Sequence, residues 1–294
     1  MTTTLTLDLA RFAVGAAAIP DQVQTSAARA ISAVVGAAAA GADSPAVDVL
    51  AELASSFGTP PEAGVPGRTE RYAASWSALL TAAAASSTVS AGYPTVVVAA
   101  ALATAGARNL GLRPVAAAVA VGLEVTARLD NWLAGSLGPF DPVPVLGRLG
   151  AAAAAARLLG LTPDATAHGF GVAATQAAGL LALAGEAAAD LQNGKAAADG
   201  VEAAWLAAGG FTGPRAAIEG RRGLAALLAP DALLAPDAVL AADAGARLAA
   251  AADGLGRTWS SAAAVLYPRD DPADLDLTVD ACLSSFPPAK RSRQ

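Results

Sequence analysis

The sequence is poor in the side chains that perform most proton transfer and covalent catalysis in proteins. Its 294 residues contain one histidine (His168), one cysteine (Cys282), two lysines (Lys195 and Lys290) and three tyrosines. A mechanism would therefore have to rely on carboxylates, hydroxyl groups, amides and shape. One histidine and one cysteine cannot build a zinc site, and no glycine-rich phosphate loop follows a strand. We expect neither a metal nor another cofactor.

Aromatic residues and alternating β-branched segments are also scarce, so the sequence gives no sign of a sheet. Aromatic residues make up 4% of the chain, whereas hydrophobic residues make up 54% and are mostly alanine. Alanine has the highest helix propensity and little bulk, which favours long helices packed closely together. The sequence predicts an all-α fold with a core of substantial size.

Charge and cysteine content argue against several kinds of partner. The formal net charge is −6 and the basic residues are scattered, so we expect no nucleic acid. A basic cluster lies in residues 287–294, which we expect to be a disordered tail. A single cysteine excludes an intrachain disulfide framework and fits a cytoplasmic protein. The first twelve residues place Asp8 in their apolar part without a preceding basic region, unlike a signal peptide.

The mean hydropathy of +0.47 raises the question of a membrane span. The stretch 72–107 carries no charge and is long enough to cross a bilayer. It is interrupted, however, by Ser86-Ser87-Thr88 and by Gly92-Tyr93-Pro94. We therefore expect two buried helices joined by a polar turn, and no membrane association.

Helix start and stop signals predict most of the fold. One domain is expected over residues 1–286, with irregular connections at the proline-rich segments 58–67 and 137–145. The predicted helices cover about 20–36, 44–56, 69–85, 94–107, 113–128, 147–159, a segment starting at Thr162, 195–208 and 238–253.

The stretch between residues 147 and 224 carries the most specific pattern. It contains GAAAAAARLLGLTPDATAHGFGVAATQAAGLL and then GKAAADGVEAAWLAAGGFTGPRAAIEGRRGL, and the earlier segments LARFAVG and YPTVVVAAALA fit the same pattern. With these segments the chain resembles the MmgE/PrpD family, which includes 2-methylcitrate dehydratase, cis-aconitate decarboxylase and iminodisuccinate epimerase. The resemblance implies the large helical domain of that family, without its smaller α+β lid domain, and a homodimer formed through the helical domain.

The functional residues of the family do not carry over to this sequence. Their positions hold other residue types: Tyr93-Pro94-Thr95 for a His-Pro-Ser motif, Asp141 for a later histidine, Ala189 and Gln192 for the lysine and histidine of a K-R-L-H segment, and Val265 or Leu266, beside Tyr267, for a further lysine. The resemblance therefore implies that a tricarboxylate is not dehydrated or decarboxylated here by the family mechanism.

Asp141 and Tyr93 are the candidate catalytic residues. Asp141 lies between apolar neighbours in a proline-fixed loop, where a carboxyl group would have a raised pKa and could exchange a proton near neutrality. It could equally be a loop aspartate that caps a turn. Tyr93 could donate a hydrogen bond to a substrate or simply pack in the core. Neutral hydrogen bonds to a small-molecule substrate are expected from Ser86, Ser87, Thr88, Gln192, Asn193 and Tyr267.

The other polar residues have structural interpretations. We expect His168 to be a buried, hydrogen-bonded core residue and Lys195 to be a solvated or structural lysine at the start of a helix. Glu124 and Arg128, four residues apart on one helix, should form an ion pair. Cys282 has no basic neighbour in the sequence and should be an inert thiol.

Two functions fit this pattern. The first is a repurposed, cofactor-independent lyase, isomerase or cyclase of secondary metabolism, acting on an apolar intermediate, for example a polyketide-like one, through shape and limited acid catalysis. Orienting a reactive substrate can lower a barrier by several kcal/mol without an acid–base pair. The second is a non-catalytic relative that acts as a partner subunit or a small-molecule binder. We adopt the first as the working hypothesis because neutral polar replacements suggest a changed ligand.

Overall fold

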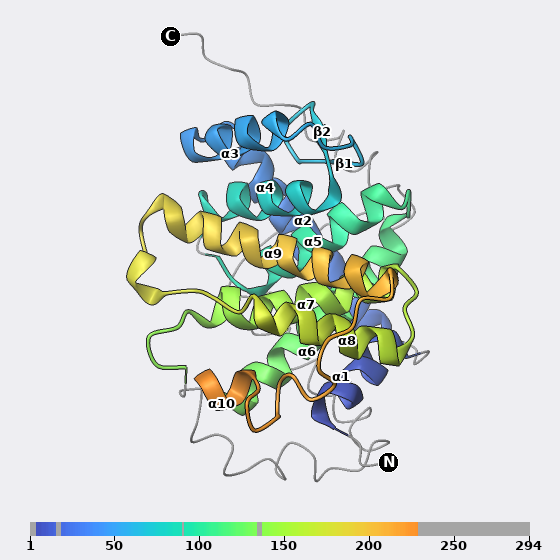
Figure 1. Ribbon diagram of the computed structural model, residues 1–294. Coiled ribbons are helices and arrows are strands. Elements are labelled where there is room, and N and C mark those ends of the chain that lie inside the picture. Colours follow the sequence, from blue (N-terminus) through green and yellow to red (C-terminus); the bar gives the residue numbers. More distant parts are fainter. Residues whose placement is uncertain (1–3, 16–18, 90, 134–136, 229–294) are drawn as a thin grey trace, which may run out of the picture.

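The structure is a computed structural model, and it describes residues 4–15, 19–89, 91–133 and 137–228. These residues form ten α-helices, one short 3-10 helix and a two-stranded antiparallel sheet (Figure 1). The all-α prediction is confirmed. The helices are α1 (Leu5–Val14), α2 (Asp21–Gly41), α3 (Pro45–Ser56), α4 (Ala74–Ser86), α5 (Tyr93–Ala107), α6 (Leu112–Leu133), α7 (Pro142–Leu158), α8 (Pro163–Thr175), η1 (Leu181–Leu183), α9 (Ala187–Ala208) and α10 (Leu224–Leu228); the strands are β1 (Ala63–Gly64) and β2 (Arg71–Tyr72).

Several predictions from the sequence lie outside the described residues. They are the helix at 238–253, the candidate Tyr267, the thiol of Cys282 and the basic tail 287–294. The domain boundary at 286 likewise stays a prediction.

Helix α7 is the central element of the fold. It packs against α1, α5, α6, α8 and α9, and every residue from Pro144 to Ala156 is buried. Its alanine run allows neighbouring helices to approach on all sides. Figure 1 shows α3 and the small sheet at one end of the molecule and α1 and α10 at the other.

The contact between α6 and α7 depends on two glycines. A Cβ atom on Gly122 would lie 2.5 Å from the carbonyl oxygen of Gly150, and one on Gly150 would lie 2.6 Å from the carbonyl oxygen of Gly122. The two backbones therefore touch directly, which no larger residue at either position would allow.

The predicted buried helix pair is confirmed. The charge-free stretch 72–107 divides into α4 and α5, which meet at a turn and are buried along most of their length. Within the part of the chain that the structure describes, no individual helix has both the length and the apolar character needed to cross a membrane. The segments Val23–Gly41 and Pro45–Ser56 would meet that test only as a pair, and the chain bends by 91° between them.

The helix starts predicted at Ser44 and Thr162 are confirmed, but other boundaries were wrong, including the end of α2, which lies at Gly41 rather than 36. Ser44 and Thr162 accept hydrogen bonds from backbone N–H groups three residues later, at 3.4 and 3.2 Å. The segment 137–145 was predicted to be irregular, yet α7 begins at Pro142, because prolines fit the first helical turn, where the N–H groups lack helical partners anyway. Helix α4 begins at Ala74 rather than near 69, because β2 pairs with β1 just before it. Helix α9 begins at Ala187 rather than 195.

Candidate functional site

Tyr93 and Asp141 lie near enough for the charge of Asp141 to act on the Tyr93 hydroxyl, and together with Asp130 they are called the polar cluster below. Tyr93 is the first residue of α5, and its hydroxyl donates a 2.8 Å hydrogen bond to Oδ1 of Asp130 near the end of α6. Burial, that hydrogen bond and the negative charges of Asp130 and Asp141 together raise the pKa of the Tyr93 hydroxyl well above its usual range. Tyr93 therefore remains protonated and acts as a hydrogen-bond donor.

Asp141 caps the central helix. Its Oδ1 accepts a 3.0 Å hydrogen bond from the backbone N–H of Val143, and its Oδ2 accepts a 3.2 Å bond from the side-chain amide of Gln192. The side chain therefore acts as the N-cap of α7 and is tied to α9 through Gln192. Of the two interpretations of Asp141, the cap is thus observed, while a catalytic role stays a prediction.

Gln192 is oriented by a loop as well as by Asp141. Its Oε1 accepts a 3.0 Å hydrogen bond from the backbone N–H of Leu180. Because Oε1 is engaged there, the amide nitrogen is the atom left to face Asp141. The loop that follows α8 therefore decides which end of this amide the site presents.

The other predicted binding residues take different positions. Asn193 is buried and donates a 3.3 Å hydrogen bond to Oγ of Ser86, between α9 and the end of α4. Ser87 donates to the carbonyl of Ala84, and Thr88 donates to those of Ala37 and Ala85. Among the described residues, no hydrogen bond joins these four side chains to Tyr93 or Asp141. Their role in binding stays a prediction.

Exposed leucines lie beside the polar cluster. Leu180, Leu181 and Leu191 are 47%, 51% and 38% exposed. Leu180 is bonded to Gln192 through its backbone, and Leu191 precedes Gln192 on α9. An apolar surface therefore adjoins the carboxylates.

Two residues of this region were missed from the sequence. Asp130 was overlooked because the preceding helix was predicted to end at 128, whereas α6 continues to Leu133. Leu129 and Leu133, spaced by four and both buried, were the signal for that extra turn. Arg148 was overlooked because it lies among apolar residues, between Gly147 and Leu149, and no local pattern marks its partners.

The structure tests the structural roles that were predicted for the other polar residues. Glu124 and Arg128 form the predicted ion pair at 2.7 Å. His168 lies 2.7 Å from the carbonyl oxygen of Gly213 through Nδ1, with its side chain 17% exposed, so it is hydrogen-bonded and mostly buried. The placement of Lys195 at a helix start was wrong, because α9 begins eight residues earlier. In the described ranges, no group of three or more His, Cys, Asp or Glu side chains could hold a metal ion.

Comparison with known proteins gives a consistent result. Residues 7–236 match the family model of the MmgE/PrpD N-terminal domain. The cis-aconitate decarboxylase-like protein oryM of Aspergillus oryzae is 40% identical over 101 residues, covering 33% of this chain and 21% of that protein. Human cis-aconitate decarboxylase is 35% identical over 112 residues, covering 37% of this chain and 23% of the human protein. The matched part thus spans about a fifth of the length of each relative.

Proposed function

The chain belongs to the MmgE/PrpD family through its N-terminal helical domain, and on that premise we propose that it is a lyase-, isomerase- or cyclase-type enzyme. Its site is the cluster of Tyr93, Asp130 and Asp141. The substrate is an uncharged, largely apolar intermediate of secondary metabolism, such as a polyketide-like one, rather than 2-methylcitrate. The protein acts without a cofactor, in the cytoplasm, as a homodimer.

One observation carries this proposal. The Tyr93 hydroxyl is held at 2.8 Å by Asp130 while the charge of Asp141 acts on the same hydroxyl. A protonated phenol can donate a hydrogen bond to a substrate carbonyl oxygen, and a neighbouring carboxylate can accept a proton from the adjacent carbon. Asp141 would be that base, and Tyr93 would be that donor once its single O–H turns from Asp130 to the substrate oxygen.

Charge and surface character support an uncharged substrate. Two carboxylates in one cluster repel a substrate that carries three more, so a tricarboxylate such as cis-aconitate fits poorly. The exposed side chains of Leu180, Leu181 and Leu191 offer apolar contact next to the same cluster. An apolar carbonyl compound matches both features.

Deuterium exchange into simple carbonyl compounds tests the proposal. The purified protein is incubated in D₂O with N-acetylcysteamine thioesters of short β-keto and β-hydroxy acids, and deuterium at the α-carbon and elimination products are followed by mass spectrometry. We expect catalysed exchange, with Asp141→Asn lowering its rate about 100-fold or more and Tyr93→Phe lowering it about tenfold or more. Glu202→Gln, on the exposed face of α9, is the control and should keep the wild-type rate.

Wild-type rates in both site variants would show that the site is elsewhere. Faster turnover of cis-aconitate than of the thioesters would contradict the change of substrate class.

A second function is favoured by the same hydrogen bonds. Both oxygens of Asp141 and the hydroxyl of Tyr93 already have partners within the fold. Such a cluster can serve stability alone, and the chain would then be a non-catalytic relative acting as a partner subunit or a small-molecule binder. Saturable binding of the thioesters without exchange or elimination would establish this alternative.

A further inference from the structure

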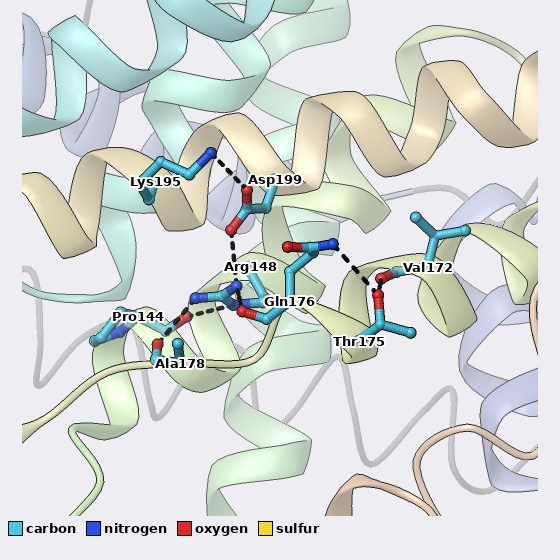
Figure 2. A network of polar contacts seen from close by, with 8 residues as sticks. All are labelled: Pro144, Arg148, Val172, Thr175, Gln176, Ala178, Lys195 and Asp199. Carbon is cyan, nitrogen blue, oxygen red and sulfur yellow. Dashed lines mark hydrogen bonds and ion pairs between the residues drawn. The ribbon is translucent and has the colours of Figure 1, made fainter.

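A buried ionic network joins α7 to α9, beyond the contact between Asp141 and Gln192 (Figure 2). The guanidinium of Arg148 donates a 2.8 Å hydrogen bond to Oδ2 of Asp199, and both side chains are almost completely buried. Oδ1 of Asp199 lies 3.1 Å from Nζ of Lys195, whose side chain is 49% exposed. Asp199 therefore joins a buried arginine to a lysine that reaches solvent.

Arg148 also binds three backbone carbonyls. Nε donates to the oxygen of Pro144 at 3.0 Å and Nη2 to that of Ala178 at 2.9 Å, while Nη1 donates to that of Gln176 as well as to Asp199. A buried guanidinium is costly unless its donors are satisfied, and its planar fork fixes the directions of all of them. Two of these carbonyls belong to the loop that follows α8, so Arg148 anchors that loop.

The two contacts between α7 and α9, one at Asp141 and one at Arg148, are separated by the same number of residues on both helices. Asp141 and Arg148 are seven residues apart on α7, and their partners Gln192 and Asp199 are seven residues apart on α9. Seven residues make about two helical turns, or roughly 10 Å. The two helices therefore run in the same direction with two polar cross-links between them, one at Asp141 and one at Arg148.

The loop 176–181 crosses both links. At one link, the carbonyls of Gln176 and Ala178 accept from Arg148. At the other, the carbonyl of Gly179 accepts a 3.3 Å hydrogen bond from the backbone N–H of Asp141, and the N–H of Leu180 donates to Gln192. The anchored residue Ala178 comes one position before Gly179 and two before Leu180, which carry the groups that orient the site.

We propose that Arg148 is a positioning residue of the candidate site: by holding the loop 176–178, it fixes the Leu180 N–H that orients the Gln192 amide toward Asp141. This inference rests on the proposed function only in counting Gln192 and Asp141 as a site. The planar guanidinium of Arg148 holds the loop through several donors in fixed directions, and its positive charge alone would not be enough. A lysine in its place would keep the ion pair with Asp199 but could not reach the carbonyls in the same geometry.

The test measures the orientation of the site directly. Arg148→Lys and Arg148→Met are compared with the wild type by NMR, using the side-chain NH₂ signals of Gln192 and hydrogen exchange at the Leu180 amide. Circular dichroism and the Tm report whether each variant remains folded. We expect both variants to speed exchange at Leu180 at least tenfold and to move the Gln192 signals toward those of a solvated amide.

Two control variants separate positioning from general loss of stability. Arg157, also on α7, is half-buried and donates to the carbonyls of Ala13 and Gly15 at 3.0 Å, away from the loop 176–181. Arg157→Lys should lower the Tm while leaving the Leu180 and Gln192 signals unchanged. Lys195→Met removes the exposed arm of the network and should also leave them unchanged.

Wild-type signals in folded Arg148→Lys would overturn the proposal, and so would equal changes in Arg157→Lys. If Arg148→Met does not fold, Arg148→Lys decides alone. These readouts require no turnover, so a failure of the proposed function in the exchange assay leaves them intact, and their failure leaves the exchange assay intact.

Discussion

At the scale of single residues, the phenol of Tyr93 shows how burial and neighbouring carboxylates hold a titratable group in one protonation state. Burial and two nearby carboxylates all favour the protonated form. The folded pKa therefore lies above the value of about 10 expected for the unfolded chain. The stabilisation that Tyr93 contributes to the free energy of unfolding is therefore complete below pH about 10. It is lost as the pH rises from there toward the folded pKa.

Alkaline titration checks this directly. In the folded protein, Tyr93 should contribute no tyrosinate absorbance between pH about 9 and 11. Tyr93→Phe should therefore leave the absorbance change in this range unaltered, and its stability should fall less steeply above pH about 10 than that of the wild type. Loss of tyrosinate amplitude in the variant within this range would contradict the shift.

The sequence could identify part of this cluster. Tyr93 and Asp141 were named because a family resemblance placed them at positions of lost histidines, and in the structure the charge of Asp141 acts on the Tyr93 hydroxyl; a shared site stays a prediction. Asp130 and Arg148 could not be found in the same way. Their partners lie on other helices, and contacts between distant segments leave no mark in local sequence spacing.

At the scale of elements, close approach of backbones governs the helix packing. The glycine pair at the α6–α7 contact replaces side chains with direct backbone contact, whereas Gly36 in α2 has nothing within 4 Å of the place where a Cβ would stand. The same residue type therefore has opposite consequences in two helices. In α2 it only adds flexibility to the unfolded chain.

A matched pair of alanine substitutions tests this difference by urea unfolding. Gly36→Ala should raise the free energy of unfolding by about 0.5–1 kcal/mol, because alanine favours the helix and meets no obstacle. Gly150→Ala should lower it by about 1–3 kcal/mol, because the new methyl group would collide with the Gly122 carbonyl. Equal effects of the two substitutions would mean that α6 and α7 are not in direct backbone contact.

Helix positions were more predictable than helix ends. Ser44 and Thr162 are local start signals, and a helix begins directly after each of them. The start of α9 was placed too late because its first residues include Asp190 and Gln192, which the pattern alone does not distinguish from a polar loop. Tertiary hydrogen bonds to the loop 176–181 and to Asp141 stabilise that first part of the helix.

At the scale of the whole molecule, the beginning of the described chain is fastened to its end. Oγ1 of Thr6 donates a 2.6 Å hydrogen bond to Oε2 of Glu219 and accepts from the backbone N–H of Ile218 at 3.3 Å. Thr4 donates to the carbonyl of Arg215 at 3.0 Å. Helix α1 therefore depends on residues more than 200 positions later.

Removing the hydrogen bonds between Thr6 and Glu219 should destabilise the end of the molecule that contains α1. Glu219→Ala leaves the buried hydroxyl and N–H of Thr6 without their acceptor and should cost about 1–3 kcal/mol of unfolding free energy, with faster hydrogen exchange in α1 than in α4. Glu52→Ala, at an exposed position on α3, should change the stability by less than about 0.5 kcal/mol. Unchanged exchange in α1 would show that its apolar contacts suffice to hold it.

The overall fold was predictable because composition and family pattern agree over most of the described chain. Alanine content indicated closely packed helices, and the match over residues 7–236 supports the same domain. The tie between α1 and the segment 215–219 was not predictable. It joins residues more than 200 positions apart, and a contact of that kind leaves no periodic pattern in the sequence.

The alanine interior of α7 also determines how the protein can move. An alanine methyl group has no rotamers, so the stretch Ala151–Ala156 loses no side-chain conformational entropy on folding and cannot repack by changing χ angles. Adaptation to a ligand would then require sliding whole helices or shifting the loop 176–181. Around this alanine stretch, adaptation therefore falls on the backbone, and the hydrogen bonds from Arg148 to the loop 176–178 restrict how far that loop can shift.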